Sequence, residues 1–474
     1  MAMVCDLVEV LYHWHFASNT LVGFDENLTY FQQHYNPNTD TGIINRLHEI
    51  FFDNNGFSDD EEALAAIKLV PAFLRARSYR SVYVILNYLS NKLYLEWNFD
   101  QALLLYKEEK LLDCFEFGNI GGKAVRYMNL ANVYADKGEF ELALPLYQKA
   151  TEMFEETLPL VGSNQWNQNL QNYILLLADI AENYLIMGLF ENAREKIDQA
   201  LSVMPPVGWD QLNAEGLAIQ IEDYAFVFTC LTKLEFLEGN VERALEVLDQ
   251  AKEQLGEVDE FDFFCSQLLI QASLGGEVEI YLEQIDQKAP IALEPTGYAS
   301  LDPDSLYLSM KKEKVRAELY EIAAKNSSSE AEIEKYLVMA RSCYENLLPK
   351  ALHVAHFQYT MHSLLGLYLT SVTLGHPVYK DASALIVFAN STGTNYWVNR
   401  IRNLLSPLLN DLTERKKIRD QLEKLVECGE ATLDLFQITD LVSDIVDLPS
   451  SEEVGLFSFL DYVEELQKLK GALG

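Results

Sequence analysis

Two pairs of asparagines place amide groups at helical spacing in the N-terminal half of the chain. Asn87 and Asn91 are four residues apart, hence on one face of a helix, and Asn129 and Asn132 follow in the next helical segment. An amide offers both a donor and an acceptor, so it can pair with a peptide backbone whatever side chains that peptide carries. A row of such amides can hold an extended chain without reading its sequence. The alternative is that they bond neighbouring helices or face water.

A glycine-rich segment, GNIGGKA at 118–124, is superficially similar to a phosphate-binding loop. It is one residue shorter than that motif requires, and Ala124 stands where a metal-binding hydroxyl is needed. No strand is predicted before it. Nucleotide binding is therefore not expected.

Residues suited to metal binding or catalysis do not form a recognisable set. His353, His356 and His362 fall in one predicted helical segment with an ordinary amphipathic pattern. Residues 51–62 have the Gly and Glu of a calcium loop, but Phe51 stands at the first ligand position and cannot bind the ion. No GxSxG nucleophile motif occurs. The sequence thus predicts no catalytic residue, no metal site and no cofactor.

The composition argues against two classes of partner. The 474 residues include 36 Lys and Arg against 72 Asp and Glu, which leaves a formal net charge of −36. A protein that binds nucleic acid nonspecifically, or an anionic membrane surface, needs a basic footprint. We therefore expect neither partner. With 49% hydrophobic residues, the chain can bury a sizeable core.

The compartment follows from the cysteines and from the apolar runs. The six cysteines lie tens of residues apart with no CxxC pair, which is typical of a protein of the reducing cytosol. The N-terminal residues carry no Lys or Arg before their apolar run, and no apolar stretch approaches the ~18 residues of a membrane span. We expect a cytoplasmic protein.

The strongest pattern is an internal repeat. Residues 125–150 carry apolar or small residues at helical spacing, then a glycine, then a second such set, and residues 175–200 and 226–251 repeat this order. A weaker copy spans 84–109, with Trp97 in place of the turn glycine. The turn positions 97, 138, 188 and 239 are 41, 50 and 51 residues apart. Each copy predicts two helices joined by a tight turn. The repeated positions are Tyr127, Leu130, Ala131, Tyr134, Gly138, Ala143, Tyr147 and Ala150; then Leu177, Ile180, Ala181, Tyr184, Gly188, Ala193, Ile197 and Ala200; then Phe228, Leu231, Thr232, Gly239, Ala244, Leu248 and Ala251.

These spacings resemble the tetratricopeptide repeat, whose standard period is about 34 residues. The segment NLANVY at 129–134 is similar to the NLGNxY signature of the longer repeats found in adaptors such as rapsyn and kinesin light chain. The resemblance covers 84–257 best. It implies an all-α, right-handed α-α superhelix, or solenoid, with irregular helical caps at both ends. Proteins of this type hold peptide segments of partners in the groove of the superhelix.

The resemblance also implies which side chains line that groove, because in this repeat class the second, fifth, sixth and ninth residues of each first helix project into it. The implied lining residues are Val84, Asn87, Tyr88 and Asn91; Val125, Met128, Asn129 and Asn132; Leu175, Ala178, Asp179 and Glu182; and Phe226, Thr229, Cys230 and Lys233. The candidate peptide-binding residues are Asn87, Asn91, Asn129, Asn132, Asp179, Glu182 and Lys233.

Acidic residues replace the family's amides in one repeat. Asp179 and Glu182 stand where asparagine is expected, which favours a ligand with a Lys, an Arg or a free amine at that place. The basic positions of the clamp that binds acidic chaperone C-termini are empty, so such C-termini are not expected as ligands. Part of the negative charge is therefore expected to be directed into the groove, as a preference for a basic partner segment.

Beyond residue 257 the repeat pattern weakens but stays helical. Helices are predicted at 306–324, 332–348, 353–374 and 382–390, with amphipathic helices at 397–430 and 452–472. No alternating apolar pattern of useful length predicts a sheet. The predicted parts are an N-terminal helical cap at 1–80, the repeats at 81–257, degenerate helical repeats at 258–395 and C-terminal capping helices at 396–474.

The leading hypothesis is a non-enzymatic adaptor or scaffold that binds a peptide or helical segment of a partner protein in the groove. The alternative is a peptide-responsive sensor or regulatory subunit, whose superhelix changes shape on binding and thereby controls an effector protein. Scattering distinguishes the two, because a sensor compacts when its ligand is added. The sequence carries no signal for the oligomeric state.

Overall fold

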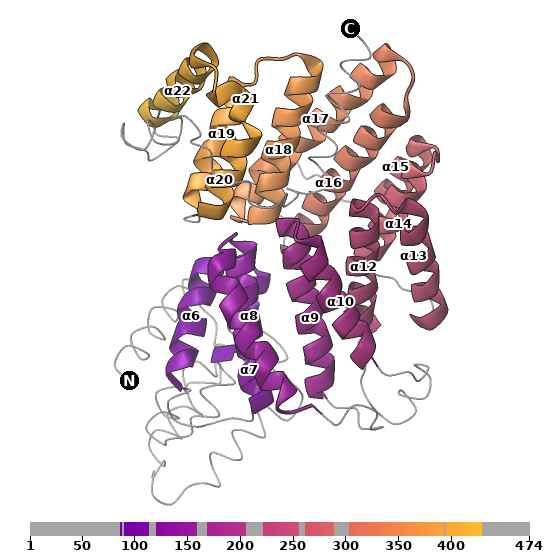
Figure 1. Ribbon diagram of the computed structural model, residues 1–474, viewed down its shortest axis with the longest axis vertical. Coiled ribbons are helices and arrows are strands. Elements are labelled where there is room, and N and C mark those ends of the chain that lie inside the picture. Colours follow the sequence, from indigo (N-terminus) through magenta and orange to yellow (C-terminus); the bar gives the residue numbers. More distant parts are fainter. Residues whose placement is uncertain are drawn as a thin grey trace, which may run out of the picture. The chain divides into compact units, whose positions relative to one another are not determined.

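The structure is a computed structural model that describes residues 86–87, 90–112, 120–158, 168–204, 221–255, 261–288, 303–392 and 395–428. Within these residues every regular element is a helix (Figure 1), so the predicted all-α class is confirmed for this part of the chain. Packing divides the chain into two compact units, Met1–Val133 and Tyr134–Gly474. The boundary lies in the last turn of the helix Ile120–Asp136.

The helices keep the order of the sequence. They are α6 (Phe99–Leu112), α7 (Ile120–Asp136), α8 (Phe140–Glu155), α9 (Gln168–Met187), α10 (Phe190–Val203), α12 (Ile221–Leu237), α13 (Val241–Leu255), α14 (Phe261–Ser273), α15 (Val278–Lys288), α16 (Pro303–Asn326), α17 (Glu330–His353), α18 (Phe357–Leu374), α19 (Tyr379–Ser391), α20 (Asn395–Leu404), α21 (Ser406–Leu409) and α22 (Leu412–Glu427).

The predicted helix–turn–helix pairs are confirmed. Gly138, Gly188 and Gly239 end α7, α9 and α12 with φ angles of +78°, +70° and +81°, and α8, α10 and α13 begin within three residues of them. Glycine adopts this left-handed conformation without the steric penalty of a Cβ atom, which is why it terminates helices so often. In the weaker copy Trp97 takes the same conformation, with φ +63°, just before α6.

The repeated apolar and small positions form the contacts between helices. Ala143, Ala193 and Ala244 have no exposed surface, and neither do the alanines seven residues further along, Ala150, Ala200 and Ala251. A small residue at such a position lets two helix backbones approach closely, while the larger repeated residues fill the remaining space. The repeated alanines are therefore buried at helix contacts, as the periodicity predicts.

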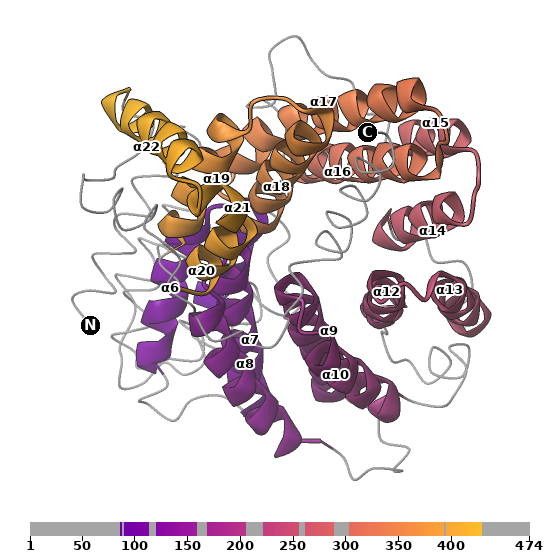
Figure 2. The same cartoon turned by 45° about the horizontal axis from the view of Figure 1, so that its top comes forward.

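In the unit Tyr134–Gly474 the helix pairs contact one another in sequence order. The first helices α9, α12, α14, α16 and α18 touch in succession, and Figure 2 shows them in that order. The second helices α10, α13, α15 and α17 each contact the first helix of the following pair as well as their own partner. The same order of contacts continues past residue 257, in helix pairs whose sequence pattern is weak.

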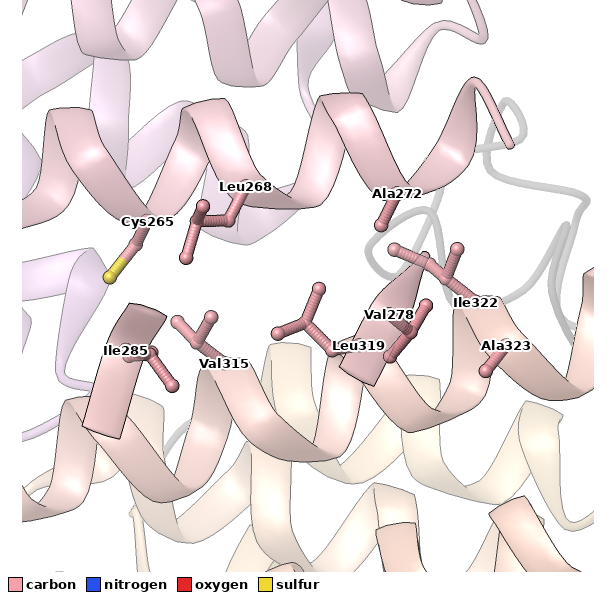
Figure 3. Packing of buried hydrophobic residues seen from close by; sticks show 9 residues of the cluster. All are labelled: Cys265, Leu268, Ala272, Val278, Ile285, Val315, Leu319, Ile322 and Ala323. Atoms are coloured by element: carbon pink, nitrogen blue, oxygen red, sulfur yellow. The ribbon is translucent and has the colours of Figure 1, made fainter. Parts of the chain in front are cut away.

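The packing between successive pairs is illustrated by α14, α15 and α16. Figure 3 shows their apolar side chains meeting in one buried cluster. Its members are Cys265, Leu268, Ala272, Val278, Ile285, Val315, Leu319, Ile322 and Ala323. Three helices from two pairs contribute to it, so this core is shared between neighbouring pairs.

Two predicted helical segments are interrupted. The segment 353–374 is broken after His353, where Ala355 adopts a φ of +54° before α18 begins. The segment 397–430 is divided into α20, α21 and α22, and Pro407 lies in the first turn of α21. Proline has no amide hydrogen to donate and disfavours helical backbone in the residue before it, which explains why a continuous helix does not form here.

Several predictions lie outside the described residues. These are the helical cap at 1–80, the calcium-like segment at 51–62 and the terminal helix at 452–472. The division of the chain into parts ending at 80, 257 and 395 stays a prediction.

Candidate functional site

Two of the predicted amides are joined in the unit Met1–Val133. Asn129 on α7 donates from Nδ2 to Oδ1 of Asn91 at 2.9 Å, and the buried Tyr106 hydroxyl of α6 donates to the same oxygen. We call Asn91 and Asn129 the amide pair. Both side chains are half-buried, and Tyr106 holds the Asn91 amide in a defined orientation.

Each residue of the amide pair has one polar atom that forms no hydrogen bond with the described residues. In the described part of the chain, the Asn91 amide nitrogen has no acceptor and the Asn129 carbonyl oxygen has no donor. One side of the pair therefore offers N–H donors and the other an acceptor. The Asn91 oxygen and the Asn129 nitrogen are bonded to each other, so these two atoms follow the predicted alternative, in which the asparagines bond neighbouring helices.

The remaining two predicted asparagines flank this pair in the sequence. Asn87 is half-buried, and its Oδ1 is buried without a donor among the described residues. Leaving a buried acceptor unpaired costs about 1–3 kcal/mol, so a group that donates to it is strongly favoured. Asn132 is half-buried on α7, close to one turn beyond Asn129.

The predicted charged residues lie in the unit Tyr134–Gly474 and contact each other. Lys233 on α12 donates to Oε1 of Glu182 on α9 at 2.7 Å, with 32% and 28% of the two side chains exposed. The negative charge of Glu182 is therefore already compensated within the chain. Asp179 is half-buried on α9, and its backbone oxygen accepts a hydrogen bond from Asn183.

Two residues that the sequence did not single out extend this ion pair. Asp262 at the start of α14 and Lys311 on α16 form a second ion pair, and Lys233 is attracted by Asp262 as well as by Glu182. Glu182, Lys233, Asp262 and Lys311 thus alternate in sign across four neighbouring first helices. We call them the charge ladder. No local pattern could have revealed it, because its members are about 30 to 50 residues apart.

Aromatic residues adjoin the last member of the ladder. Lys311 donates to the Tyr307 hydroxyl at 2.7 Å and lies over the Tyr307 ring, 4.5 Å from its centroid. Tyr307 contacts Tyr359 of α18 edge to face, and the His356 ring lies 4.6 Å from that of Tyr359. Burial lowers the pKa of His356 to about 3, so this imidazole is neutral at physiological pH.

Several other residues implied by the resemblance are buried. Met128, Ala178 and Thr229, all at the fifth position of a first helix, have 4%, 0% and 0% of their surface exposed. Cys230 is fully buried too. These side chains pack against neighbouring helices and do not reach a ligand. The expectation that all four positions of a first helix line the groove is therefore wrong for these four residues.

The residues considered for other chemistry are placed apart from one another. Ile120 begins α7, so Gly121, Gly122 and Lys123 are helical and do not form a phosphate-binding loop. His353 is exposed, while His362 is buried beside Tyr344. Over the described ranges, no group of three or more His, Cys, Asp or Glu residues is close enough to hold a metal ion.

Comparison with models of known protein families and with curated proteins finds no match for this chain. Among the helices of the described residues, none has both the length and the apolar character needed to span a membrane.

Proposed function

We propose that the chain is a cytoplasmic, non-enzymatic adaptor of the tetratricopeptide-repeat type, in which a right-handed superhelix of helix pairs binds a peptide segment of a partner protein. The amide pair is the observation that carries this proposal. The stacking of helix pairs with small residues at their contacts supports the repeat type.

The chemistry of the amide pair suits a peptide backbone. A peptide group presents one carbonyl oxygen and one N–H, and the pair offers the complement of both through Asn91 and Asn129. Their other polar atoms are engaged with each other and with Tyr106, so the amides are oriented before a ligand arrives. Preorganisation reduces the entropy lost on binding. Because no ligand side chain is involved, these contacts hold an extended segment without reading its sequence.

The charge ladder belongs to the other unit, Tyr134–Gly474. The charges of its two carboxylates and two ammonium groups cancel, whereas the whole chain has a net charge of −36. We propose that the partner segment carries a basic residue. This preference follows from the net negative charge of the whole chain.

The experiment compares the full-length chain with an Asn91→Ala, Asn129→Ala variant. The probe is a library of N-acetylated, C-amidated dodecapeptides, from which the best binder is titrated by calorimetry. Each hydrogen bond lost is worth about 1–3 kcal/mol, so the double variant, which loses two, should bind at least about 30-fold more weakly. A version of the peptide with methylated backbone amides should likewise bind the parent chain with lower affinity.

Asn410→Ala is the matched control, because it removes an exposed amide from α21's C-terminal end and leaves the amide pair intact. Thermal melts of each variant show that the fold persists. Unchanged affinity in the double variant would contradict the proposal.

A further inference from the structure

The amide pair has two arrangements that satisfy its internal hydrogen bond. In the observed one, Asn129 donates from Nδ2 to Oδ1 of Asn91, which leaves the Asn91 nitrogen and the Asn129 oxygen facing a ligand. If both amides turned over, Asn91 would donate to Asn129, and the Asn91 oxygen and the Asn129 nitrogen would face the ligand instead. The terminal torsion of asparagine is nearly two-fold, so the pair by itself has little preference between these arrangements.

The Tyr106 hydroxyl favours the observed arrangement. It donates to the same Asn91 oxygen that accepts from Asn129. A hydroxyl has one proton, and after the amides turned over that proton would meet an N–H group in place of the oxygen. Tyr106 has no exposed surface, so water does not replace the lost acceptor. A buried donor that loses its acceptor destabilises the arrangement in which this happens.

We propose that Tyr106 is a positioning residue that fixes the polarity of the amide pair, with the donor on Asn91 and the acceptor on Asn129, and thereby the direction in which a peptide binds. This inference rests on the proposed function, because it concerns the same site and the same ligand. Along one edge of an extended chain, N–H and C=O groups alternate, and reversing the chain exchanges their places. A pair of fixed polarity therefore prefers one direction.

A retro-inverso peptide tests this polarity. It has the reversed sequence built from D-amino acids, so its side chains keep their order in space while each C=O and N–H exchange places. The best-binding dodecapeptide of the library and its retro-inverso form are each titrated into the full-length chain by calorimetry. Because one hydrogen bond separates the two arrangements, the parent chain should bind the original peptide about tenfold more tightly.

Tyr106→Phe should remove most of that preference. Phenylalanine fills the same buried space but donates no hydrogen bond, so both arrangements become about equally populated. Affinity for the original peptide should then fall only about twofold, while affinity for the retro-inverso peptide should rise about fivefold, in proportion to the two populations. A merely structural role of Tyr106 would weaken both peptides alike, whereas the proposed role requires one of them to bind more tightly.

Tyr147→Phe is the matched control, because it removes a buried tyrosine hydroxyl that accepts from the amide of Asn183, in the other unit. It should leave the preference between the two peptides unchanged. The inference is wrong if the parent chain binds both peptides equally, or if Tyr106→Phe does not raise the affinity for the retro-inverso peptide. The first of these results needs no variant, so it decides the question even where Tyr106→Phe does not fold.

The Asn91→Ala, Asn129→Ala variant separates this inference from the proposed function. If that variant binds the original peptide more weakly than the parent chain does, while the preference between the two peptides ignores Tyr106, only the inference about polarity fails. If its affinity is unchanged, or if no peptide of the library binds the parent chain, the proposed function fails and the inference falls with it.

Discussion

Glu321 is a buried residue whose environment makes the stability of the protein depend on pH. Its side chain lies on α16 with 5% of its surface exposed and accepts a hydrogen bond of 2.8 Å from the Tyr344 hydroxyl of α17. Gly366 of α18 makes room for the Tyr344 ring, because a Cβ atom at that position would overlap it. Burial raises the pKa of the Glu321 carboxyl to about 8; the hydrogen bond from Tyr344 lowers it, and the nearby charge of Glu318 raises it. At neutral pH the folded protein therefore holds this carboxyl in its protonated form.

The elevated pKa predicts that stability falls as pH rises. In the unfolded chain Glu321 loses its proton near its ordinary pKa of 4.5, whereas in the folded chain it retains the proton up to about pH 8. Between these values the folded state binds more protons than the unfolded state, so the free energy of unfolding decreases with pH, on the order of 1 kcal/mol per pH unit. Below pH 4.5 and above pH 8 this contribution no longer changes.

Glu321→Gln should remove that dependence, because the amide stays neutral and still accepts a hydrogen bond from Tyr344. Chemical denaturation at pH 5, 6.5 and 8 should show the variant gaining stability over the parent chain as pH rises. Glu334→Gln, an exposed position on α17, is the control and should change stability little at any of these pH values. A constant difference between Glu321→Gln and the parent chain would contradict the assignment.

At the scale of elements, the turn glycines have the same conformation but different surroundings. Gly138 and Gly239 have φ angles of +78° and +81°, so each meets the requirement of a helix-ending turn. Gly239 has open space where a Cβ would lie, whereas a Cβ at Gly138 would overlap the ring of Phe357 in α18. Gly138 therefore serves both the local turn and a contact distant in the sequence.

Alanine substitutions at the two glycines should separate these roles. Gly239→Ala is expected to lose about 1–2 kcal/mol of stability, the cost of a left-handed conformation for a residue with a Cβ atom. Gly138→Ala carries the same strain and must also displace Phe357, which adds about 1–3 kcal/mol. Urea denaturation of both variants measures the difference. Equal losses of stability in the two variants would show that the Phe357 ring moves aside at no cost in free energy.

At the scale of the whole molecule, the unit Tyr134–Gly474 is joined by contacts between segments far apart in the sequence. Phe140 at the start of α8 contacts both Phe357 and Trp397, with ring centroids 5.7 Å and 5.9 Å away, and those two rings are 4.9 Å apart. Arg400 donates to the backbone oxygen of Met187 at the end of α9, 213 residues earlier in the sequence. The first pairs of this unit are therefore packed against α18 and α20 as well as against their neighbours.

Trp397→Ala should weaken helices at both ends of this contact. The side chain is fully buried, and removing it should lower the stability by about 3–5 kcal/mol. Because Trp397 packs on Phe140, hydrogen exchange should quicken in α8 as well as in α18 and α20. Leu248→Ala is the comparison, since this buried residue lies on α13, which packs against α12 and α14, the helices next to it in the sequence. Unchanged exchange in α8 would show that the contact does not couple the two segments.

The helix pairs could be predicted from the sequence because their signals are local. Spacing identified Ala143, Ala193 and Ala244 as buried, and a glycine in the turn revealed where one helix ends and the next begins. The boundaries were less certain where a break depends on context. Ala355 adopts a left-handed conformation that alanine rarely takes, so nothing in its local sequence announces the turn before α18.

The candidate site was predictable only in part. The amides of Asn91 and Asn129 were identified from their positions in the repeat, but their bond to each other was not. The ion pair between Glu182 and Lys233 was not predicted, because it depends on how α9 and α12 pack side by side.

The amino-acid sequence by itself determined the helical class, the repeat, the turn glycines and the buried face of each helix. Only the tertiary structure decided which charges neutralise one another and which distant rings meet, as in the charge ladder and at Trp397. The physical reason is that periodicity reflects the geometry of one helix, which repeats every 3.6 residues. The partner across a contact is set by the packing of whole helices, and no spacing within either helix records it.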